Sequence, residues 1–291
     1  MKRLLLILTT VLMSLLASGC TSAQGTDQIA ATTLPVYEFA SRLCTGTDIT
    51  VSRLITENVS CLHDYTLQVS QMRAVGGANA VILSGAGLEE FLEDALDRAQ
   101  HTIDASEGLA LPESPHEHEH DHGHIHETDP HIWLSPANAA IMAQNICKGL
   151  SDLFPEHKTT FQKNLADLLT DLDALQRYGQ ETLSTLSCRD LITFHDGFSY
   201  FAESFNLSIL KAVEEESGSE ASAAELIELI RLVDNNNIPA IFTETNGSTS
   251  AANIISAECD VRVYTLDMCM SGDSYFSAMY RNIDTIWEAM Q

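Results

Sequence analysis

Short apolar runs alternate along the first half of the chain with stretches in which apolar residues recur at three- and four-residue steps. The runs are rich in β-branched residues, which favours strands, whereas the spaced stretches favour helices with one buried face. The expected strands lie at 29–33, 49–55 and 80–83, and the expected helices at 35–43, 66–75, 88–99 and 135–150. Because strands that alternate with helices usually pair in parallel, this half is predicted to be an α/β lobe.

The second half shows the same alternation of short apolar runs and amphipathic stretches. Its expected strands lie at 190–194, 207–211, 239–243 and 261–266, and its expected helices at 197–205, 222–235, 250–258 and 274–290. The two halves share this architecture without a convincing repeat in their sequences. A second α/β lobe is therefore predicted.

The longest helical pattern separates the two halves. Leucines recur on one face between 155 and 186, with polar residues on the other, although Gly179 would bend or weaken a helix there. At ~1.5 Å per residue the helix would be more than ~40 Å long, about the length of a domain. We predict an α/β fold of two lobes, each a small, mainly parallel sheet flanked by helices, joined by one long linker helix. The predicted bounds are 29–154 for the N-terminal lobe, 155–187 for the linker helix and 188–291 for the C-terminal lobe.

The N-terminus has the pattern of an export signal. Lys2 and Arg3 precede an apolar stretch over 4–16, which is shorter than the ~20 residues that a membrane-spanning helix needs. Small residues then lead to Cys20, and Ala-Ser-Gly-Cys resembles the lipidation site of bacterial lipoproteins. We predict a signal peptide over 1–19, a lipid on Cys20 and a flexible, lipid-anchored tether over 20–28.

The composition is strongly acidic. The chain has 41 Asp and Glu against 15 Lys and Arg, which gives a formal net charge of −26. This charge argues against a nucleic-acid partner and attracts cations, although a generally acidic exterior explains most of it by itself. Seven cysteines are present, and the six after Cys20 allow many disulfide pairings or none.

A polar insertion over 108–129 interrupts the first lobe and contains a histidine-rich loop over 114–127. Its histidines alternate mainly with acidic residues and glycine: His116, His118, His120, His122, His124 and His126. Neutral imidazole beside carboxylate binds borderline divalent metals, whereas a packed core cannot use such a run. We interpret the loop as an auxiliary site of weak zinc capture. A sensor of the metal level and a solvated spacer are the alternatives.

Four residues that can bind a metal fall at or near the ends of expected strands. His63 lies beyond the strand at 49–55, His131 precedes the helix at 135–150, and His195 and Asp267 directly follow strands of the second half. Ligands of open α/β sheets bind beyond the carboxyl ends of strands, and three imidazoles with one carboxylate complete a tetrahedral zinc site. A single histidine of this kind is more often an ordinary hydrogen-bonded residue. The recurrence of one topological position carries the prediction.

Several phrases around these residues resemble one family. They are Cys-Leu-His-Asp-Tyr at 61–65, Asp-Pro-His-Ile-Trp-Leu-Ser-Pro at 129–136, Phe-His-Asp-Gly-Phe-Ser-Tyr-Phe at 194–201, Ile-Phe-Thr-Glu at 241–244, Gly-Asp-Ser-Tyr at 272–275 and Asn-Ile-Asp-Thr at 282–285. These motifs resemble the cluster A-I metal-binding receptors of bacterial ABC importers, the zinc-receptor and laminin-binding-type lipoproteins. The resemblance covers roughly 29–290.

The resemblance implies two α/β lobes bridged by one helix, with a metal ion held between them. Carried over by motif, the ligands are His63, His131, His195 and Asp267. The manganese receptors place Glu where this chain has His195, so the implied ion is Zn²⁺ as transported ligand rather than Mn²⁺. Met-Cys-Met at 268–270 replaces the Pro-Leu-Gly of many zinc members, which leaves Asp267 or a water as the fourth ligand.

Carboxylates beside these positions are expected to act through the ligands. Glu244 and Asp196 are interpreted as cleft residues, Glu244 orienting a ligand histidine. A zinc hydrolase that uses either carboxylate as its base is an alternative from a different class. The His-Glu-x-x-His matches of the chain, at 116–120 and 118–122, fall in the histidine-rich loop and not on an expected helix, which argues against it.

The resemblance implies a binding protein and not an enzyme. The expected function is an extracytoplasmic receptor that captures Zn²⁺ and delivers it to the membrane permease of an ABC transporter. It would be a monomer, lipid-anchored to the bacterial cell membrane or in the periplasm. A manganese receptor of the same family and an adhesin are the remaining alternatives.

Overall fold

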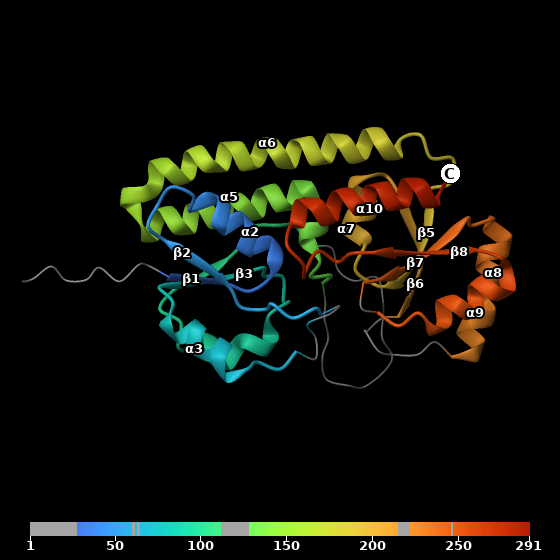
Figure 1. The fold of residues 1–291 in the computed structure, drawn as a ribbon, viewed down its shortest axis with the longest axis horizontal. Coiled ribbons are helices and arrows are strands. Elements are labelled where there is room, and N and C mark those ends of the chain that lie inside the picture. The colour runs from blue at the N-terminus through green and yellow to red at the C-terminus, as the bar shows by residue number, and fades with distance from the viewer. Residues whose placement is uncertain (1–27, 60–61, 63–64, 112–127, 215–221, 246) are drawn as a thin grey trace, which may run out of the picture.

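A computed structural model describes residues 28–59, 62, 65–111, 128–214, 222–245 and 247–291. Two groups of strands and helices lie next to each other, and one long helix runs along both (Figure 1). The sheets of both groups are parallel throughout the described part of the chain. The predicted α/β fold of two lobes is thereby confirmed.

The first lobe is built on a sheet with the strand order β2-β1-β3-β4. Its strands are β1 (Gln28–Ala31), β2 (Thr50–Arg53), β3 (Ala80–Leu83) and β4 (Thr102–Asp104). Its helices are α2 (Leu34–Leu43), α3 (Val69–Gly77), α4 (Glu93–Leu96) and α5 (Pro136–Leu153), with short 3-10 turns η1 (Glu90–Leu92) and η2 (Ile132–Leu134). The central strands β1 and β3 are apolar and buried because helices lie on both sides of them (Figure 1).

The second lobe has the strand order β6-β5-β7-β8. Its strands are β5 (Asp190–His195), β6 (Ser208–Glu214), β7 (Ala240–Glu244) and β8 (Arg262–Leu266). Its helices are α7 (Ser199–Ser204), α8 (Ala223–Asn236), α9 (Ser250–Cys259) and α10 (Tyr275–Ala289). The neighbours β5 and β7 end at His195 and Glu244. The chain order reverses between these strands, which is where open α/β sheets bind ligands.

The long helix α6 (Lys158–Leu183) follows the turn η3 (Pro155–His157) and contacts both lobes. It packs on α2 and α5 of the first lobe and on α10 of the second. The helix continues unbroken through Gly179, so the expected weak point is not seen. A Cβ atom at Gly179 would overlap the Phe205 ring. This glycine therefore allows α6 to pack closely on the second lobe.

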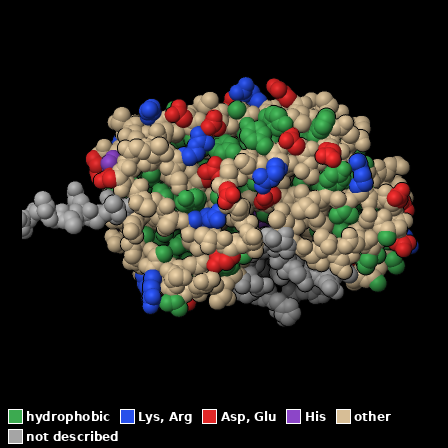
Figure 2. Space-filling view, viewed as in Figure 1, with side chains coloured by type: hydrophobic (Ala, Val, Ile, Leu, Met, Phe, Trp, Pro, Cys, Tyr) green, Lys and Arg blue, Asp and Glu red, His purple; other side chains and the backbone are tan. Residues whose placement is uncertain are grey.

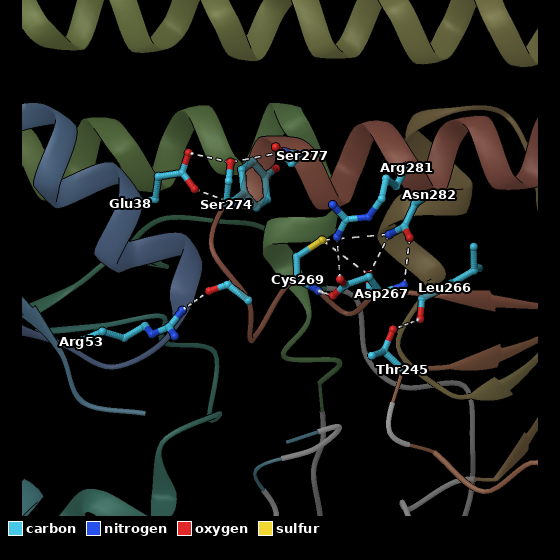
Figure 3. Close-up of polar contacts among 12 residues, drawn as sticks. Glu38, Arg53, Thr245, Leu266, Asp267, Cys269, Ser274, Ser277, Arg281 and Asn282 are labelled. Atoms are coloured by element: carbon cyan, nitrogen blue, oxygen red, sulfur yellow. Dashed lines mark hydrogen bonds and ion pairs between the residues drawn. The ribbon is translucent and has the colours of Figure 1, made fainter. Parts of the chain in front are cut away.

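The two lobes also bind each other directly near the start of α10. Glu38 of α2 accepts a hydrogen bond from the Tyr275 backbone N–H at 2.6 Å, and Arg53 donates to the Gly272 carbonyl at 2.8 Å (Figure 3). The Phe39 and Tyr275 rings pack edge to face with centroids 5.1 Å apart. One hydrophobic core includes residues of both lobes and of α6. The lobes are thus joined by apolar packing as well as by the connecting helix.

One predicted helix is much shorter than expected. The stretch 88–99 contains only η1 and the single turn α4, although its apolar side chains Leu88, Leu92 and Ala95 are buried. The buried Glu89 carboxylate turns back to accept bonds from the N–H groups of Ser84 and Gly85 at the end of β3. A side chain that bonds the preceding backbone competes with helix formation. The next strand, β4, was not predicted.

Glu89 is expected to make the stability of the first lobe depend on pH. Burial raises the pKa of its carboxyl to about 7, although hydrogen bonds from Thr32, Ser84 and Gly85 oppose this. A carboxyl whose pKa is higher in the folded than in the unfolded state stabilises the fold at low pH, and this contribution is lost as the pH rises from 4.5 toward 7. Over this pH range, the free energy of unfolding of the wild type should fall by up to about 3 kcal/mol relative to that of the Glu89→Gln variant. Urea denaturation of both proteins at several pH values measures this difference. A difference that does not change with pH contradicts the prediction.

The described part of the chain contains no disulfide. Its cysteines are free thiols: Cys44, Cys147, Cys188, Cys259 and Cys269. Cys20 and Cys61 lie outside the described residues. Within the ranges that the structure describes, no helix combines the length and the apolar character needed to cross a membrane.

Candidate metal centre

Two histidines from different lobes meet where the lobes join. His131 directly precedes η2 in the first lobe, and His195 ends β5 in the second. Their Nε2 atoms are 3.3 Å apart, their rings are inclined by 88°, and each residue is 2% exposed. Two nitrogens bound to one tetrahedral zinc ion at ~2.0–2.1 Å are themselves ~3.3–3.4 Å apart. The observed pair therefore fits two ligands of one shared metal ion.

The His131 ring is oriented by a carboxylate two residues before it. Oδ1 of Asp129 accepts a hydrogen bond from the His131 backbone N–H at 2.9 Å and lies 2.8 Å from His131 Nδ1. A carboxylate at this distance favours the tautomer with the proton on Nδ1, which leaves the Nε2 lone pair for a metal. The next helix starts nearby, because Ser135 Oγ accepts from the Asn138 N–H and Pro136 occupies its first turn. The local sequence thus fixes both the backbone and the ring.

The His195 ring has a carboxylate on the side opposite His131. Its Nδ1 lies 3.6 Å from Glu244 Oε2, and both side chains are almost fully buried. Glu244 ends β7, the strand next to β5. This adjacency places the carboxylate on the Nδ1 side of the ring, at ion-pair rather than hydrogen-bond distance, while Nε2 faces His131. Asp196, the other expected cleft residue, follows His195 in the chain and is half-buried.

Gly197 lacks a side chain, so Met268, His195 and His131 can all pack closely against it. A Cβ atom there would lie 2.6 Å from Met268 Cε, 2.8 Å from His195 Cδ2 and 2.9 Å from His131 Nδ1. Met268 is fixed to the first lobe, because its carbonyl accepts a 2.8 Å hydrogen bond from Trp133 Nε1. The segment after β8 therefore lies against the imidazole pair.

Asp267 stands next to this segment but has its own partners (Figure 3). Its Oδ2 is 3.1 Å from Arg281 Nη2, and its Oδ1 accepts the Cys269 N–H at 2.8 Å. Asn282 binds the Asp267 backbone at both its N–H and its carbonyl. Burial raises the pKa of the Cys269 thiol well above its usual range, so this residue is a neutral thiol.

The structure brings together two of the four predicted ligands. Among the described residues, no three His, Cys, Asp or Glu side chains are grouped closely enough to hold a metal. His63 lies outside the described residues, so its place as a ligand stays a prediction. The predicted auxiliary histidines lie outside them too: His116, His118, His120, His122, His124 and His126.

Sequence reasoning missed the roles of Asp129, Asn282 and Arg281. The spacing Asp-Pro-His at 129–131 is a usable signal, because a carboxylate two residues before a histidine can reach its Nδ1. Asn282 and Arg281 lie 14 or more residues from Asp267 in the sequence. Their contacts depend on how α10 packs on β8, which no local pattern reveals.

The chain is similar to known proteins that are described as metal-binding. The zinc-binding lipoprotein AdcA of Streptococcus pneumoniae is 31% identical over 307 aligned positions, which cover 98% of this chain and 60% of the relative. A putative metal-binding protein of Treponema pallidum is 26% identical, over 78% of this chain and 76% of that protein. The chain thus spans only 60% of the length of the AdcA relative.

Solved structures show the same fold. The crystal structure of ZnuA superposes with a TM-score of 0.82 at 30% identity, covering 92% of this chain and 100% of that one. The Zn(II)-bound ZnuA-like domain of S. pneumoniae AdcA gives a TM-score of 0.76 at 29% identity, covering 91% and 99%. Residues 29–289 match the family described as zinc-uptake complex component A, periplasmic. With two lobes, a connecting helix and a match over nearly all described residues, the chain belongs to the ZnuA family.

Proposed function

We propose that this chain is an extracytoplasmic receptor that captures Zn²⁺ between its lobes and delivers it to the membrane permease of an ABC importer. The observation that carries the proposal is the convergence of His131 and His195, with Nε2 atoms 3.3 Å apart. Each imidazole comes from a different lobe and has a carboxylate near its Nδ1. The zinc-bound state of the AdcA domain of similar fold supports zinc as the ion.

In this proposal His63 is the third imidazole and Asp267 the fourth ligand, with a water as the alternative to Asp267. Asp129 and Glu244 orient the ligand rings from behind. A site with several imidazoles and at most one carboxylate favours zinc, whereas a site richer in carboxylates favours manganese. The chain acts as a binding protein and not as an enzyme.

The cellular setting is part of the same proposal. A lipid on Cys20 would anchor the monomer outside the cytoplasm, with 20–28 as the tether, within reach of its permease. On the face seen in Figure 2, Asp and Glu are intermingled with Lys and Arg over both lobes. The net acidic charge attracts cations of any kind. In this proposal, the preference for zinc over other cations comes from the buried imidazoles.

The metal content of the purified protein tests the proposal. The variant lacking 114–127 should retain one zinc per chain after dialysis, and a molar excess of Mn²⁺ should not displace it. The full chain should hold additional zinc weakly through the histidine-rich loop. Mass spectrometry of the native protein measures both. Loss of the tightly held zinc together with the loop, or its displacement by Mn²⁺, contradicts the proposal.

Asp129→Ala is expected to lower zinc affinity about 10- to 100-fold, the usual cost of removing a partner that orients a ligand histidine. The His131 ring would lose its only described bond at Nδ1 and with it the preference for a free Nε2. Asp129→Asn should lie between this variant and the wild type. Competition against a zinc-binding dye measures the affinity.

Asp48→Ala is the matched control for this prediction. Asp48 forms a carboxylate–imidazole pair with His157 at 2.9 Å, away from the centre, and its loss removes the same charge. An equal effect of the two substitutions would mean that Asp129 acts only through net charge.

A further inference from the structure

The Asp267 carboxylate is bound on both of its oxygens in a short segment that runs from β8 to α10. Oδ2 pairs with Arg281 of α10 at 3.1 Å, and Oδ1 accepts the Cys269 N–H at 2.8 Å (Figure 3). The Asp267 side chain is 19% exposed and Arg281 is 63% exposed. A partly buried anion is therefore neutralised by a cation that is mostly in solvent.

Asn282 fixes the backbone beneath this carboxylate. Its Oδ1 accepts the Asp267 N–H at 2.8 Å, and its Nδ2 donates to the Asp267 carbonyl at 2.7 Å. Asn282 is 2% exposed, and neither bond competes with solvent. The Asp267 carboxylate can thus change partners by rotating its side chain while its backbone stays in place.

This fixed backbone is close to the imidazole pair. Met268, the next residue, approaches the space beside Gly197 that His131 and His195 also border. Its carbonyl is bound to Trp133 Nε1 across the lobe junction. Asp267 therefore directly precedes the residue whose side chain borders the two histidines, while its own carboxylate is paired with Arg281.

We propose that Arg281 competes with the zinc ion for the Asp267 carboxylate and so sets how readily the receptor releases its ion. The inference rests on the proposed function, in which Asp267 is the fourth ligand. When zinc takes the carboxylate, the guanidinium moves into solvent, at small cost because it is already mostly exposed. When zinc leaves, the guanidinium replaces it and spares the carboxylate an unpaired, partly buried charge. Arg281 is thus a positioning residue that weakens the hold on zinc.

The opposite role for Arg281 makes the opposite prediction. If the guanidinium stayed on Oδ2 while Oδ1 bound zinc, it would orient the ligand and its removal would speed zinc release. The direction of the change therefore separates the two roles.

The experiment measures zinc release to an excess of chelator by stopped flow. Arg281→Ala should release zinc about two- to fivefold more slowly than the control, as expected for the loss of a modest ion pair. Arg281→Lys, which keeps the charge, should stay close to the wild type. In the Asp267→Asn background, Arg281→Ala should have no effect, which a double-mutant cycle reveals.

Arg177→Ala is the matched control. Arg177 is 62% exposed and pairs with Asp173 at 3.0 Å on α6, so its removal makes the same change in net charge. Circular dichroism shows that each variant is folded. Equal or faster release from Arg281→Ala than from Arg177→Ala overturns the inference. If Asp267→Asn released zinc at the wild-type rate, the inference about Arg281 would also be overturned, but the protein would remain a zinc receptor with imidazole ligands. Tight zinc binding that survived His131→Ala would instead overturn the proposed function.

Discussion

His195→Ala is expected to abolish tight zinc binding, with a loss of affinity of more than about 100-fold, because ligands matter more than the partners that orient them. In the proposed site His195 is the imidazole ligand of the second lobe, and its Nε2 faces that of His131 at 3.3 Å. The substitution removes one of the two imidazoles that meet at the proposed metal site. Dye competition on the variant lacking 114–127 measures the tight site without the auxiliary histidines. His131→Ala should give a loss of similar size.

His157→Ala is the control for these substitutions. His157 also pairs with an aspartate, but it lies at the start of α6, away from the lobe junction. Its removal should leave zinc affinity unchanged. Because His195 is buried, thermal unfolding without metal shows whether the variant is folded. A folded His195→Ala protein with intact zinc affinity would refute the interlobe site.

Trp133→Ala is expected to lower the free energy of unfolding by about 3–5 kcal/mol, the usual cost of deleting a large buried aromatic side chain. Trp133 is fully buried, and its Nε1 donates to the Met268 carbonyl in the other lobe. The substitution would leave a cavity and an unpaired buried carbonyl at the lobe junction. Urea denaturation followed by circular dichroism measures the change.

Trp287→Ala provides the comparison for Trp133. Trp287 is 40% exposed on α10, and its Nε1 donates to Thr185 Oγ1 at 3.3 Å. Its loss should cost less than about 1 kcal/mol, as is usual for surface residues. If the two substitutions destabilised the protein equally, Trp133 would not be a principal link between the lobes.

The sequence pattern predicted most of the fold because buried strands and one-sided helices impose their own periodicity. The strand β3 and the long helix α6 are clear cases, the first a continuous apolar run and the second a repeated leucine face. The strand β4 escaped because three residues with an exposed–buried–exposed pattern are too few for a periodic signal. The shortened helix after β3 depends on Glu89, whose carboxylate accepts bonds from the nearby Ser84 and Gly85 N–H groups and from the Thr32 hydroxyl, which is distant in the sequence.

The candidate site was partly predictable for a topological reason. His195 ends a central strand and His131 precedes a capped helix, so both fall where α/β lobes present ligands. The pairing of Asp267 with Arg281 could not be predicted, because it depends on the packing of α10 against β8. The predicted roles of all four residues as metal ligands stay predictions: His63, His131, His195 and Asp267.

The shared core of the two lobes has a consequence for ion exchange. If the two lobes swung apart, the Phe39–Tyr275 contact and the face of α6 that packs on α10 would be exposed to water. This exposure would cost about 25 cal/mol for each Å² of apolar surface. An ion could instead enter and leave if a few side chains near the metal centre rotated, and this motion would not expose the shared core. Loading and unloading are therefore expected to leave the hydrodynamic radius of the protein nearly constant.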